Sequence, residues 1–560
     1  MAQTLTQAAQ AENLRCAQEG RPPLPVVPAV RLRNHGDNET WRPELALRPS
    51  SDIEQLCDIM RFLREAGAAT VKAGGSRHSW SKAAASDGVY LHPEEMSFVR
   101  AVTDDARESA VLRQGAEARL EDCFVIGSGT RIGEIDDALW AKGKALPVLG
   151  GYDGQTLAGV VQTATHGSVL RFGPICDAVL AINLVDAQGQ KWRIEPAAGP
   201  SDPAAFAAHC PDWTLRQEDG LFDAALVSMG MFGVVHSYVV TVRDAFHLRE
   251  RRTLMKASEL VAMLRGGNIY RLMDVDEPSW LGLDDGRRVP NHPANVYHLE
   301  FLVNPHATEG GDHTVVVTSR QLFDPGTPEP PQFRRTRADA KDLFRVLSQP
   351  SRFSRPALGT WIVEHAPWLP AALQGVVATL LPHRVPDLLD RGMKGIADEE
   401  FVGRSYNVFN IGLGQNNIPA LSSEPSVPLR DDLYLDALQL ILERAERNGA
   451  AGRFHTGPLS MRFVAGSKAM LADHEDVCRF EIIYTAGTRY APDQMREYED
   501  ALFERFGGDV RPHWGQINNL NAASKGRLES MYPRLQAWKA LRQEFDPQGV
   551  FLNDWQRELF

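Results

Sequence analysis

The chain has 560 residues, and its composition excludes several classes of protein. Hydrophobic residues make up 43%, charged residues 24% and aromatic residues 8%, close to the averages of globular chains, which excludes a disordered tail protein and a membrane channel. The formal net charge of −12, without a basic block, excludes a primary nucleic-acid surface and an anionic-membrane anchor, because both depend on clustered Lys and Arg. At roughly 100–200 residues per domain, the length predicts two large domains or a few smaller ones.

The six cysteines lie far apart and form no Cys-x-x-Cys pair, which excludes the usual zinc and thioredoxin spacings. They are predicted to be reduced, mostly buried thiols, and no metal site is expected. The first 16 residues are polar and lack the residue order of a secretory signal, so a cytoplasmic location is expected. No stretch of 18 apolar residues occurs, so no membrane-spanning helix is expected.

The pattern before residue 245 predicts an α+β domain. Residues 1–45 are rich in proline between 22 and 28 and have few periodic apolar positions, which indicates an extension lying on a domain. A helix is predicted from the N-cap Ser51 to Gly67. Strands and helix-like segments then alternate, with strands at 70–73, 89–91, 124–126, 178–185, 191–194 and 234–242 and a helix at 132–142.

The chain beyond residue 245 carries more strand-like segments and predicts a second, sheet-containing domain. The predicted strands are 295–303, 313–317, 406–411, 460–464 and 479–484. Two other segments interrupt them. One is a Pro- and Arg-rich stretch, 324–337, and the other is an apolar segment, 361–381, which is either a buried helix or an oily lid over a substrate mouth.

The most informative segment is 71–80, Val-Lys-Ala-Gly-Gly-Ser-Arg-His-Ser-Trp, in which a predicted strand opens into a glycine loop. The two glycines allow positive φ and close approach, so successive backbone N–H groups can turn toward one anion, which suits a pyrophosphate. The two serines add hydroxyl donors, and His78 lies where a bound cofactor could touch it. The alternative is a strand-to-strand turn with an incidental histidine.

A second segment, 146–168, is rich in glycine and small residues, which a flat cofactor needs for close backbone contact. Together the two segments resemble the flavin domain of the vanillyl-alcohol oxidase superfamily, which binds FAD on a PCMH-type α+β domain without a Rossmann fingerprint. The carboxyl end, at 511–516, 531–534 and 545–553, is similar to that of the sugar-lactone and alditol oxidases. The chain length and the apolar segment 361–381 also resemble the flavin-linked cholesterol oxidases.

This resemblance implies a two-domain flavoprotein with a fixed order along the chain. Its parts are an N-terminal extension (1–45), a FAD-binding domain (46–245), a sheet-based substrate-binding domain (246–500) and a C-terminal segment (501–560) that returns to the FAD domain. The resemblance also implies that His78 is covalently attached to the C8 methyl carbon of the flavin. A free His78 beside a noncovalently bound FAD is the alternative.

The segment 228–235 is similar to a superfamily segment near the flavin. The FAD-binding residues implied by these matches come from the two glycine segments, from 228–235 and from the carboxyl end: His78, Gly74, Gly75, Ser76, Arg77, Ser79, Gly150, Gly151, Thr156, Gly159, Thr163, His166, Gly167, Ser168, Gly230, Gly233, Val234, His513 and Asn553. The ring of His166 is expected to be structural, with its backbone neighbours touching the cofactor.

Oxidation of an alcohol by flavin needs an acceptor for the hydroxyl proton and groups that stabilise developing negative charge. The resemblance places Arg462 on the arginine of the family's Glu-x-Arg strand, with Ser460 replacing the glutamate. Arg462 stays charged and can hold an alkoxide or an anionic flavin. Glu481 aligns with a histidine that could accept a proton, and burial would raise its pKa toward that of a general base; an ordinary salt-bridged glutamate is the alternative. Gln516 replaces a lysine.

These departures, with Gly151 in place of a serine, disfavour a small hydrophilic alditol. The expected substrate is a sugar lactone, a polyol-like alcohol or a bulkier secondary alcohol. Gly150 stands at a position whose size influences dioxygen access in the superfamily, and glycine leaves the path open, so an oxidase that releases hydrogen peroxide is predicted. The alternatives are a flavin dehydrogenase that reduces a quinone or cytochrome, and a flavin-binding protein without turnover.

Overall fold

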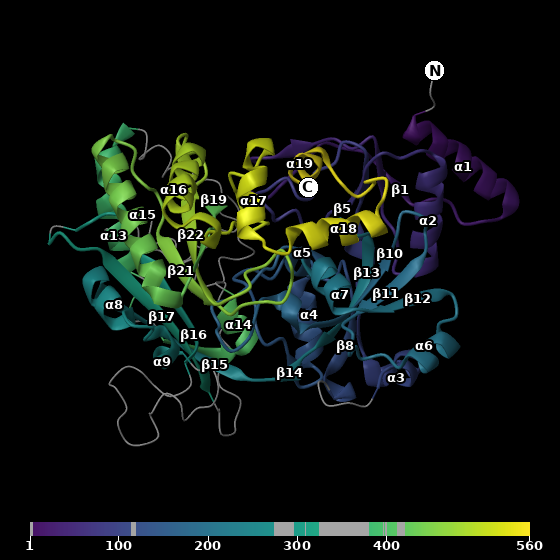
Figure 1. Ribbon diagram of the computed structural model, residues 1–560, viewed down its shortest axis with the longest axis horizontal. Helices are drawn as coiled ribbons and strands as arrows, with labels where there is room; N and C mark the ends of the chain where they lie inside the picture. The colour runs from purple at the N-terminus through teal and green to yellow at the C-terminus, as the bar shows by residue number, and fades with distance from the viewer. Residues whose placement is uncertain are drawn as a thin grey trace, which may run out of the picture.

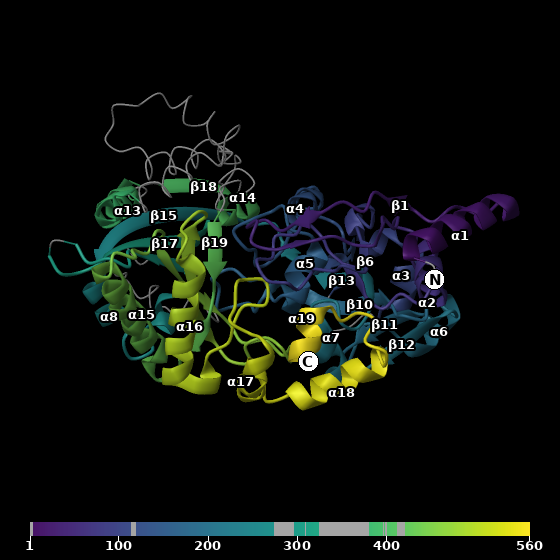
Figure 2. The same cartoon turned by 90° about the horizontal axis from the view of Figure 1, so that it is seen from above.

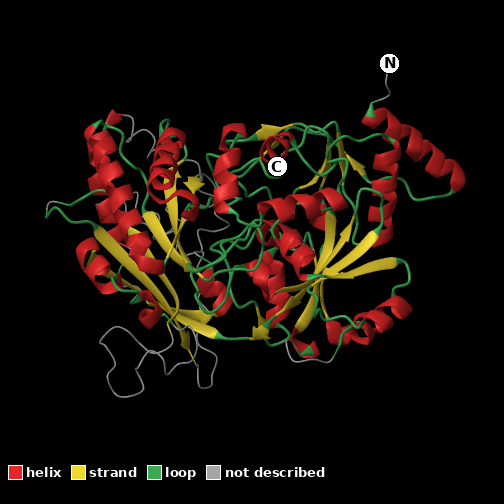
Figure 3. Cartoon of the chain, viewed as in Figure 1, coloured by secondary structure: helices red, strands yellow, loops and turns green. Residues whose placement is uncertain are grey.

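The computed structural model describes residues 4–113, 119–273, 296–308, 310–323, 380–395, 397, 400–410 and 420–560. These residues form two sheet-based units side by side, which confirms the expected α+β, two-domain architecture (Figure 1). Figure 3 shows the strands in two groups, each flanked by helices. Among the described helices, none is long and apolar enough to cross a membrane.

A four-stranded sheet leads into the glycine loop of the first unit. Its order is β1-β4-β6-β5, and β4 and β5 both pair with β6 in parallel. Helix α2 buries Leu56, Ile59 and Met60 in the same core as the strands. The bounds are β1 (Val26–Val27), β4 (Leu45–Leu47), α2 (Ile53–Glu65), β5 (Val71–Ala73) and β6 (Val89–Leu91).

The first 65 residues differ from the sequence prediction at two points. Helix α1 (Leu5–Glu19) occupies the expected extension, where a capping box between Thr4 and Gln7 begins it. The sequence did not predict this helix, because it has few apolar residues and therefore little hydrophobic periodicity. The N-cap of α2 is Asp52, because its carboxylate accepts the backbone N–H of Glu54, and the predicted cap Ser51 lies one residue earlier.

A six-stranded sheet, of order β12-β11-β10-β13-β8-β7, completes the first unit. All neighbours are antiparallel except β11 and β12. The strands are β7 (Val99–Ala101), β8 (Cys123–Gly127), β10 (Val179–Val185), β11 (Lys191–Glu195), β12 (Trp213–Gln217) and β13 (Val234–Thr241). The helices are α3 (Ala106–Val111), α4 (Ile132–Trp140), α5 (Leu157–Gln162), α6 (Pro203–His209) and α7 (Asp219–Leu226). Short pairs join β2 (Leu32–Arg33) to β3 (Thr40–Trp41) and β9 (Lys144–Ala145) to β14 (Arg243–Asp244).

An eight-stranded antiparallel sheet forms the second unit. Its order is β18-β15-β17-β16-β21-β22-β19, with β20 also paired to β22. The strands are β15 (His247–Lys256), β16 (Val296–Val303), β17 (Thr314–Phe323), β18 (Glu400–Arg404), β19 (Ala420–Ser423), β20 (Ser426–Pro428), β21 (Leu459–Val464) and β22 (Val477–Thr485). The helices are α8 (Ala257–Leu264), α9 (Ile269–Leu272), α13 (Val385–Gly395), α14 (Ser405–Phe409), α15 (Leu433–Ala450) and α16 (Ala491–Phe506).

The two faces of this sheet differ because side chains alternate along each strand. Leu459, Met461 and Phe463 of β21 enter an apolar core that α8, α15 and α16 share. Ser460 and Arg462 therefore lie on the opposite face. The register pairs Ser460 with Glu481 of β22 and Arg462 with Glu300 of β16. This face therefore carries polar side chains from three adjacent strands.

Most strands expected beyond residue 245 are present. The strands predicted at 295–303, 313–317, 460–464 and 479–484 correspond to β16, β17, β21 and β22. The strand predicted at 406–411 is wrong, because Ser405–Phe409 form helix α14, whose Val408 and Phe409 are buried in the core. Short apolar runs fit either a strand or a buried helix, and packing decided this one. Residues 324–337 and 361–379, which include the expected Pro- and Arg-rich stretch and most of the apolar segment, lie outside the described residues.

The C-terminal segment runs back over the first unit. Figure 2 shows α17 (Lys525–Met531) and α18 (Leu535–Phe545) along one edge of the molecule, ending at α19 (Asp554–Leu559). Trp538 of α18 is buried and donates from its indole N–H to the carbonyl of Ala224 in α7. The last residues therefore contribute to the core of the unit that carries the glycine loop.

Lys72 of β5 ties three distant segments together beneath the glycine loop. Its side chain is buried, and its ammonium donates to the carbonyls of Met229 (2.8 Å) and Phe551 (3.1 Å) and to Oε1 of Gln556 (3.0 Å). Burial lowers the pKa of Lys72 to about 7, with Asp546 opposing the shift. Lys72 thus fixes the 228–235 loop and the chain end to the strand before the loop.

Lys72→Met is expected to lower the free energy of unfolding by about 3 kcal/mol, because it removes three buried hydrogen bonds from one ammonium group. Urea unfolding followed by tryptophan fluorescence measures the effect. The matched control is Lys82→Met, since Lys82 is exposed. Equal midpoints for the two variants would contradict the role of Lys72.

Candidate active site

A groove in the first unit collects most of the residues that the sequence nominated for FAD. It encloses about 1060 Å³ not filled by protein atoms, open solvent included. The nominated residues that line it are Gly74, Gly75, Ser76, Arg77, His78, Ser79, Thr156, Gly159, Thr163, Gly230, Gly233, Val234 and His513, and Gln516 lines it as well.

The glycine loop is a cradle of free backbone donors. Within the described residues, the backbone N–H groups of residues 75–79 donate to no protein acceptor, whereas those of Gly74 and Trp80 bond to the carbonyls of Leu91 and Gly515. Residues 75–79 line the groove, and unpartnered backbone N–H groups are the donors that bind an anion such as a pyrophosphate. The donor set therefore fits FAD at this position.

The glycines of the loop are required by packing. A Cβ on Gly75 would lie 2.0 Å from Oγ1 of Thr156, and a Cβ on Gly74 would lie 2.0 Å from the hydroxyl of Tyr90. Gly230 has φ of +72° and Gly233 has φ of +151°, both in the range that favours glycine. The backbone can therefore come close to a flat ligand at each of these positions.

His78 lies where the groove meets a second cavity. Its ring centroid is 4.3 Å from the ring of Tyr152 and 4.3 Å from that of His35, and 5.2 Å from that of Trp80. Burial, with a smaller contribution from His35, lowers the pKa of His78 to about 3. The imidazole is therefore neutral at physiological pH and keeps a lone pair on one nitrogen.

The second cavity lies between the two units and shares several lining residues with the groove. His78, Trp80, Gln155, Thr165, His513 and Gln516 line both. The remaining lining residues come from the second glycine segment and from the polar face of the eight-stranded sheet: Gly150, Gly151, Tyr152, His166, Glu424, Arg462 and Glu481. The structure thus brings the expected substrate residues next to the expected flavin residues. The side-chain Oε1 of Gln516 is buried without a protein partner in the described chain, which leaves an acceptor at this junction.

Arg462 is the central cation of this cavity. Its Nε donates to Oε1 of Glu300 (3.0 Å) and its Nη2 lies 2.9 Å from Oε2 of Glu481. These carboxylates, with Glu424, raise its pKa although burial opposes the shift. The guanidinium stays charged and is fixed in direction by two carboxylates on either side.

Glu300 supplies a carboxylate beside Arg462, although Ser460 stands where the family's Glu-x-Arg strand has a glutamate. It lies on β16 directly opposite Arg462, and the hydroxyl of Ser460 donates to its Oε1 (2.8 Å). The pKa of Glu300 is held well below its usual range by Arg462 and His298, although burial opposes this. Sequence reasoning missed Glu300 because it is 160 residues away. Its signal was a lone acid in the predicted strand 295–303.

Glu481 has features of both expected roles, the general base with a raised pKa and the salt-bridged glutamate. It forms an ion pair with Arg462, and burial together with Glu424 and Glu300 raises its pKa to about 7 although Arg462 opposes the shift. Three carboxylates, those of Glu300, Glu424 and Glu481, thus surround one arginine. Their mutual repulsion favours a proton on one member of the group at neutral pH.

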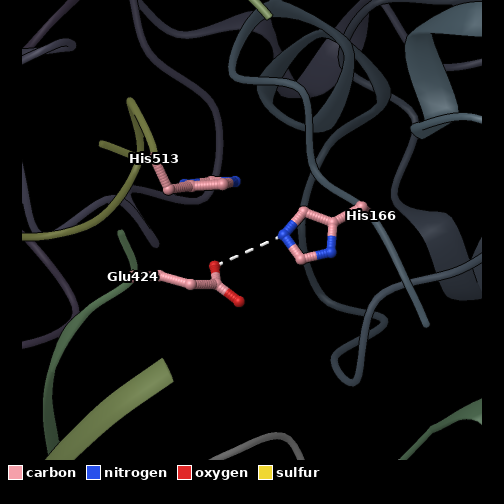
Figure 4. Close-up of side chains that lie close together, drawn as sticks. All are labelled: His166, Glu424 and His513. Atoms are coloured by element: carbon pink, nitrogen blue, oxygen red, sulfur yellow. Dashed lines mark ion pairs between the residues drawn. The ribbon is translucent and has the colours of Figure 1, made fainter. Parts of the chain in front are cut away.

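Glu424, which sequence reasoning also missed, joins two histidines in a buried cluster (Figure 4). Its Oε2 lies 3.4 Å from Nε2 of His166, and the rings of His166 and His513 are 5.6 Å apart. Two histidines and a carboxylate are metal-ligand types, and one atom of each lies within 4.8 Å of the others. A cation there would compete with the charge of Arg462 and with the backbone N–H of Gly515, which bonds to Nδ1 of His513 (3.1 Å).

Three of the nominated FAD residues line neither cavity in the described structure. Ser168 donates to the carbonyl of Leu299 and accepts the backbone N–H of Phe463 (2.8 Å), which ties the second glycine segment to β16 and β21. Gly167 packs against the backbone of residue 149. The side-chain amide of Asn553 donates to the carbonyls of Lys82 (2.8 Å) and Ala85 (2.9 Å). These residues position the loops that line the groove.

Comparison with known proteins agrees with this arrangement. The family model described as FAD binding domain matches residues 43–195, and the model described as D-arabinono-1,4-lactone oxidase matches residues 336–559. The chain is 22% identical to L-gulonolactone oxidase of Bos taurus, over 95% of this chain and 98% of that protein. It is 23% identical to L-gulono-1,4-lactone dehydrogenase of Mycobacterium tuberculosis (94% and 98% covered) and 24% identical to alditol oxidase of a Streptomyces species (95% and 99% covered).

The fold is also found among solved structures. A crystal structure of cholesterol oxidase from B. sterolicum superimposes with a TM-score of 0.65 at 14% identity, covering 96% of this chain and 99% of that one. The resemblance drawn from the glycine segments and the carboxyl end is therefore confirmed. The chain has a PCMH-type FAD-binding domain and is similar over nearly its whole length to FAD-dependent sugar-lactone and alditol oxidoreductases.

Proposed function

We propose that this protein oxidises a CH–OH group to a carbonyl, with the substrate held in the cavity between the two units. The observation that carries the proposal is a buried, oriented arginine in a cavity that shares six lining residues with the FAD groove. When bound, FAD supplies a hydride acceptor for the carbinol C–H. Named relatives that act on lactones, alditols or long-chain alcohols support the same reaction class.

Arg462 is proposed to bind the substrate oxygen. Its charge stabilises the alkoxide character that develops as the C–H bond breaks, and Glu300 and Glu481 keep the guanidinium from turning away. Ser460 positions Glu300 by donating a hydrogen bond to its carboxylate. The unpartnered side-chain oxygen of Gln516 at the cavity wall can accept a hydrogen bond from a substrate hydroxyl. Burial of the cavity makes each of these interactions stronger than it would be in water.

The proposed substrate is a sugar lactone, a polyol-like alcohol or a bulkier secondary alcohol. The test is anaerobic mixing of the FAD-loaded protein with L-gulono-1,4-lactone, xylitol, 1-dodecanol and cholesterol, with the loss of visible flavin absorbance as readout. Reduction by at least one of these four probes is expected. Photoreduction of the flavin without reduction by any probe would favour the flavin-binding protein without turnover.

Dioxygen is proposed as the electron acceptor and hydrogen peroxide as the product, with a quinone- or cytochrome-linked dehydrogenase as the second candidate. The dehydrogenase is kept because one relative is named a dehydrogenase. The cytoplasmic location expected from the polar first residues stays a prediction.

Gly150→Ala tests the oxygen path. The new methyl would lie 3.2 Å from Cγ2 of Thr165 and 3.6 Å from the carbonyl of His166, so it fits with a shift of a few tenths of an ångström while narrowing the cavity. Reoxidation of the reduced flavin by dioxygen is expected to slow about tenfold, a barrier increase of about 1.4 kcal/mol, while anaerobic reduction stays unchanged. Stopped-flow mixing of reduced protein with oxygenated buffer measures it. Unchanged reoxidation would remove Gly150 from the oxygen path.

A further inference from the structure

We propose that Arg320, which lines neither the groove nor the cavity, is a positioning residue for the oxidation: it keeps His298 a neutral hydrogen-bond acceptor, which leaves the charge of Glu300 to Arg462. This inference rests on the proposed function, because Arg462 is the group proposed to bind the substrate oxygen. Arg320 lies on β17, two strands away from Arg462 on β21. The link between them is a row of buried side chains on the eight-stranded sheet.

This row crosses four adjacent strands, β15, β17, β16 and β21 (Figure 1). The register pairs Glu250 with Arg320, Arg320 with His298, and Glu300 with Arg462. The first four of these side chains are at most 5% exposed, and they lie on the face opposite the apolar core of α8, α15 and α16. Because the row is buried, each charge in it acts strongly on its neighbours.

The first argument is the direction of the hydrogen bonds that Arg320 makes. Its Nε donates to Oε2 of Glu250 (2.7 Å), and its Nη1 lies 2.7 Å from Nε2 of His298. A guanidinium only donates, so Nε2 of His298 accepts and carries no hydrogen. A protonated ring would place two donors face to face at this distance. The contact with Arg320 therefore requires a neutral His298.

The second argument is the position of His298 beside Glu300. Its Nε2 lies 3.8 Å from Oε2 of Glu300, close enough for an ion pair if the ring were protonated. Burial and the charge of Arg320 lower the pKa of His298 to about 3, although Glu300 opposes the shift. Arg320 thus prevents His298 from becoming a second cation at this carboxylate.

The third argument is that Arg462 depends on Glu300 for its direction. Oε1 of Glu300 accepts from Nε of Arg462 (3.0 Å) and from the hydroxyl of Ser460 (2.8 Å). A charged His298 would compete with Arg462 for this carboxylate and shift the guanidinium. Such a shift lowers the reaction rate, because the substrate oxygen must be held close to its productive position.

The charged groups that face His298 come from three strands of the described chain. They are Arg320 of β17, Glu300 of β16 and Arg462 of β21. Glu250 of β15 pairs with Arg320 on the side away from His298. Removal of Arg320 therefore leaves His298 between Glu300 and an uncompensated Glu250, which favours the protonated ring.

The test is the pH dependence of anaerobic flavin reduction in Arg320→Met, with the alcohol that reduces the wild-type flavin fastest among the four probes above. Methionine removes the donor to His298, so the ring is free to take a proton. The variant is expected to reduce the flavin about tenfold more slowly at mildly alkaline pH. As pH falls, it is expected to lose further rate relative to wild type, because His298 then becomes a cation beside Glu300. A variant whose profile runs parallel to that of wild type would overturn the inference.

The double variant Arg320→Met/His298→Gln shows whether His298 causes this additional loss. Glutamine takes no proton in this range, so the double variant is expected to stay slower than wild type but to show no additional loss at low pH. An additional loss that persists in the double variant would overturn the inference, since another group would then be titrating.

Arg193→Met is the matched control for the loss of a buried arginine. Arg193 is 2% exposed, as Arg320 is, and its Nη2 lies 2.7 Å from Oε2 of the buried Glu108. It belongs to the first unit and lines neither the groove nor the cavity. The control is expected to lower stability and keep the wild-type pH profile. Equal profiles for Arg193→Met and Arg320→Met would show a purely structural role and overturn the inference.

Arg320→Lys carries the test if Arg320→Met does not fold. Lysine keeps the positive charge beside Glu250 but lacks the fork that reaches Glu250 and His298 through separate nitrogens. A smaller loss of rate is expected, again increasing as pH falls. A wild-type rate and profile in Arg320→Lys would overturn the inference.

A second measurement needs no substrate and separates failure of this inference from failure of the proposed function. Nitrogen-15 NMR of histidine-labelled, FAD-loaded protein reports the charge of His298, with His298→Gln identifying its signal. The ring is expected to be neutral in wild type at neutral and mildly acidic pH and to gain a proton in Arg320→Met as pH falls. A protonated His298 in wild type at neutral pH would overturn the inference even if every probe alcohol reduced the flavin. Absence of reduction by all probes, with the expected NMR result, would count against the proposed function alone.

Discussion

His78→Ala is expected to convert a covalently bound flavin into one that acid extracts. Precipitation of the wild-type protein with trichloroacetic acid should leave a yellow pellet, and the variant should give a colourless pellet and a yellow supernatant. Attachment through a histidine requires an unprotonated ring nitrogen that attacks the C8 methyl carbon of the flavin. Because burial lowers the pKa of His78 to about 3, the ring is unprotonated at neutral pH.

The matched control for this experiment is His35→Ala. The ring of His35 lies 4.3 Å from that of His78 and shares its surroundings, but it lines neither the groove nor the cavity. This variant should retain the yellow pellet. A yellow pellet from His78→Ala would contradict attachment of the flavin through His78. Release of the flavin by the wild-type protein would be consistent with the fold but would show that the flavin is not covalently bound.

Arg462→Ala is expected to slow reduction of the flavin by substrate about 1000-fold, while FAD binding is unchanged. The variant removes the cation that holds the developing alkoxide and leaves Glu300, Glu424 and Glu481 without their shared partner. The pKa values of these carboxyls should then rise, and a neutral, protonated cluster cannot replace the lost charge. Anaerobic stopped-flow reduction measures the rate, and the flavin spectrum measures binding.

Arg462→Lys is the informative companion variant. It keeps a positive charge but loses the planar fork that reaches Glu300 and Glu481 at once, so a partial loss of rate is expected. Reduction of Arg462→Ala at the wild-type rate would show that the substrate oxygen is held elsewhere.

The local pattern of the sequence was sufficient to predict the strand and the glycine loop that contribute residues to the site. Strand alternation predicted 460–464, and the structure places Ser460 and Arg462 on its polar face, because the period of two is a property of any extended backbone. The glycine loop after a short strand was predicted as an anion cradle, and the unpartnered N–H groups of residues 75–79 fit that reading. Both inferences depend only on neighbouring residues.

Register and packing between distant segments decided the rest. Glu300 restores the carboxylate beside Arg462 only because β16 and β21 pair in one antiparallel register, and a shift of one residue would turn it into the apolar core. Glu424 follows a four-residue strand and has no periodic signal of its own. Residues 405–409 form a helix because Val408 and Phe409 pack into a core made by other segments. The sequence by itself determined which residue types were available for flavin and alkoxide chemistry. Only the tertiary structure determined which carboxylates surround Arg462, because these contacts join side chains that lie far apart in the chain.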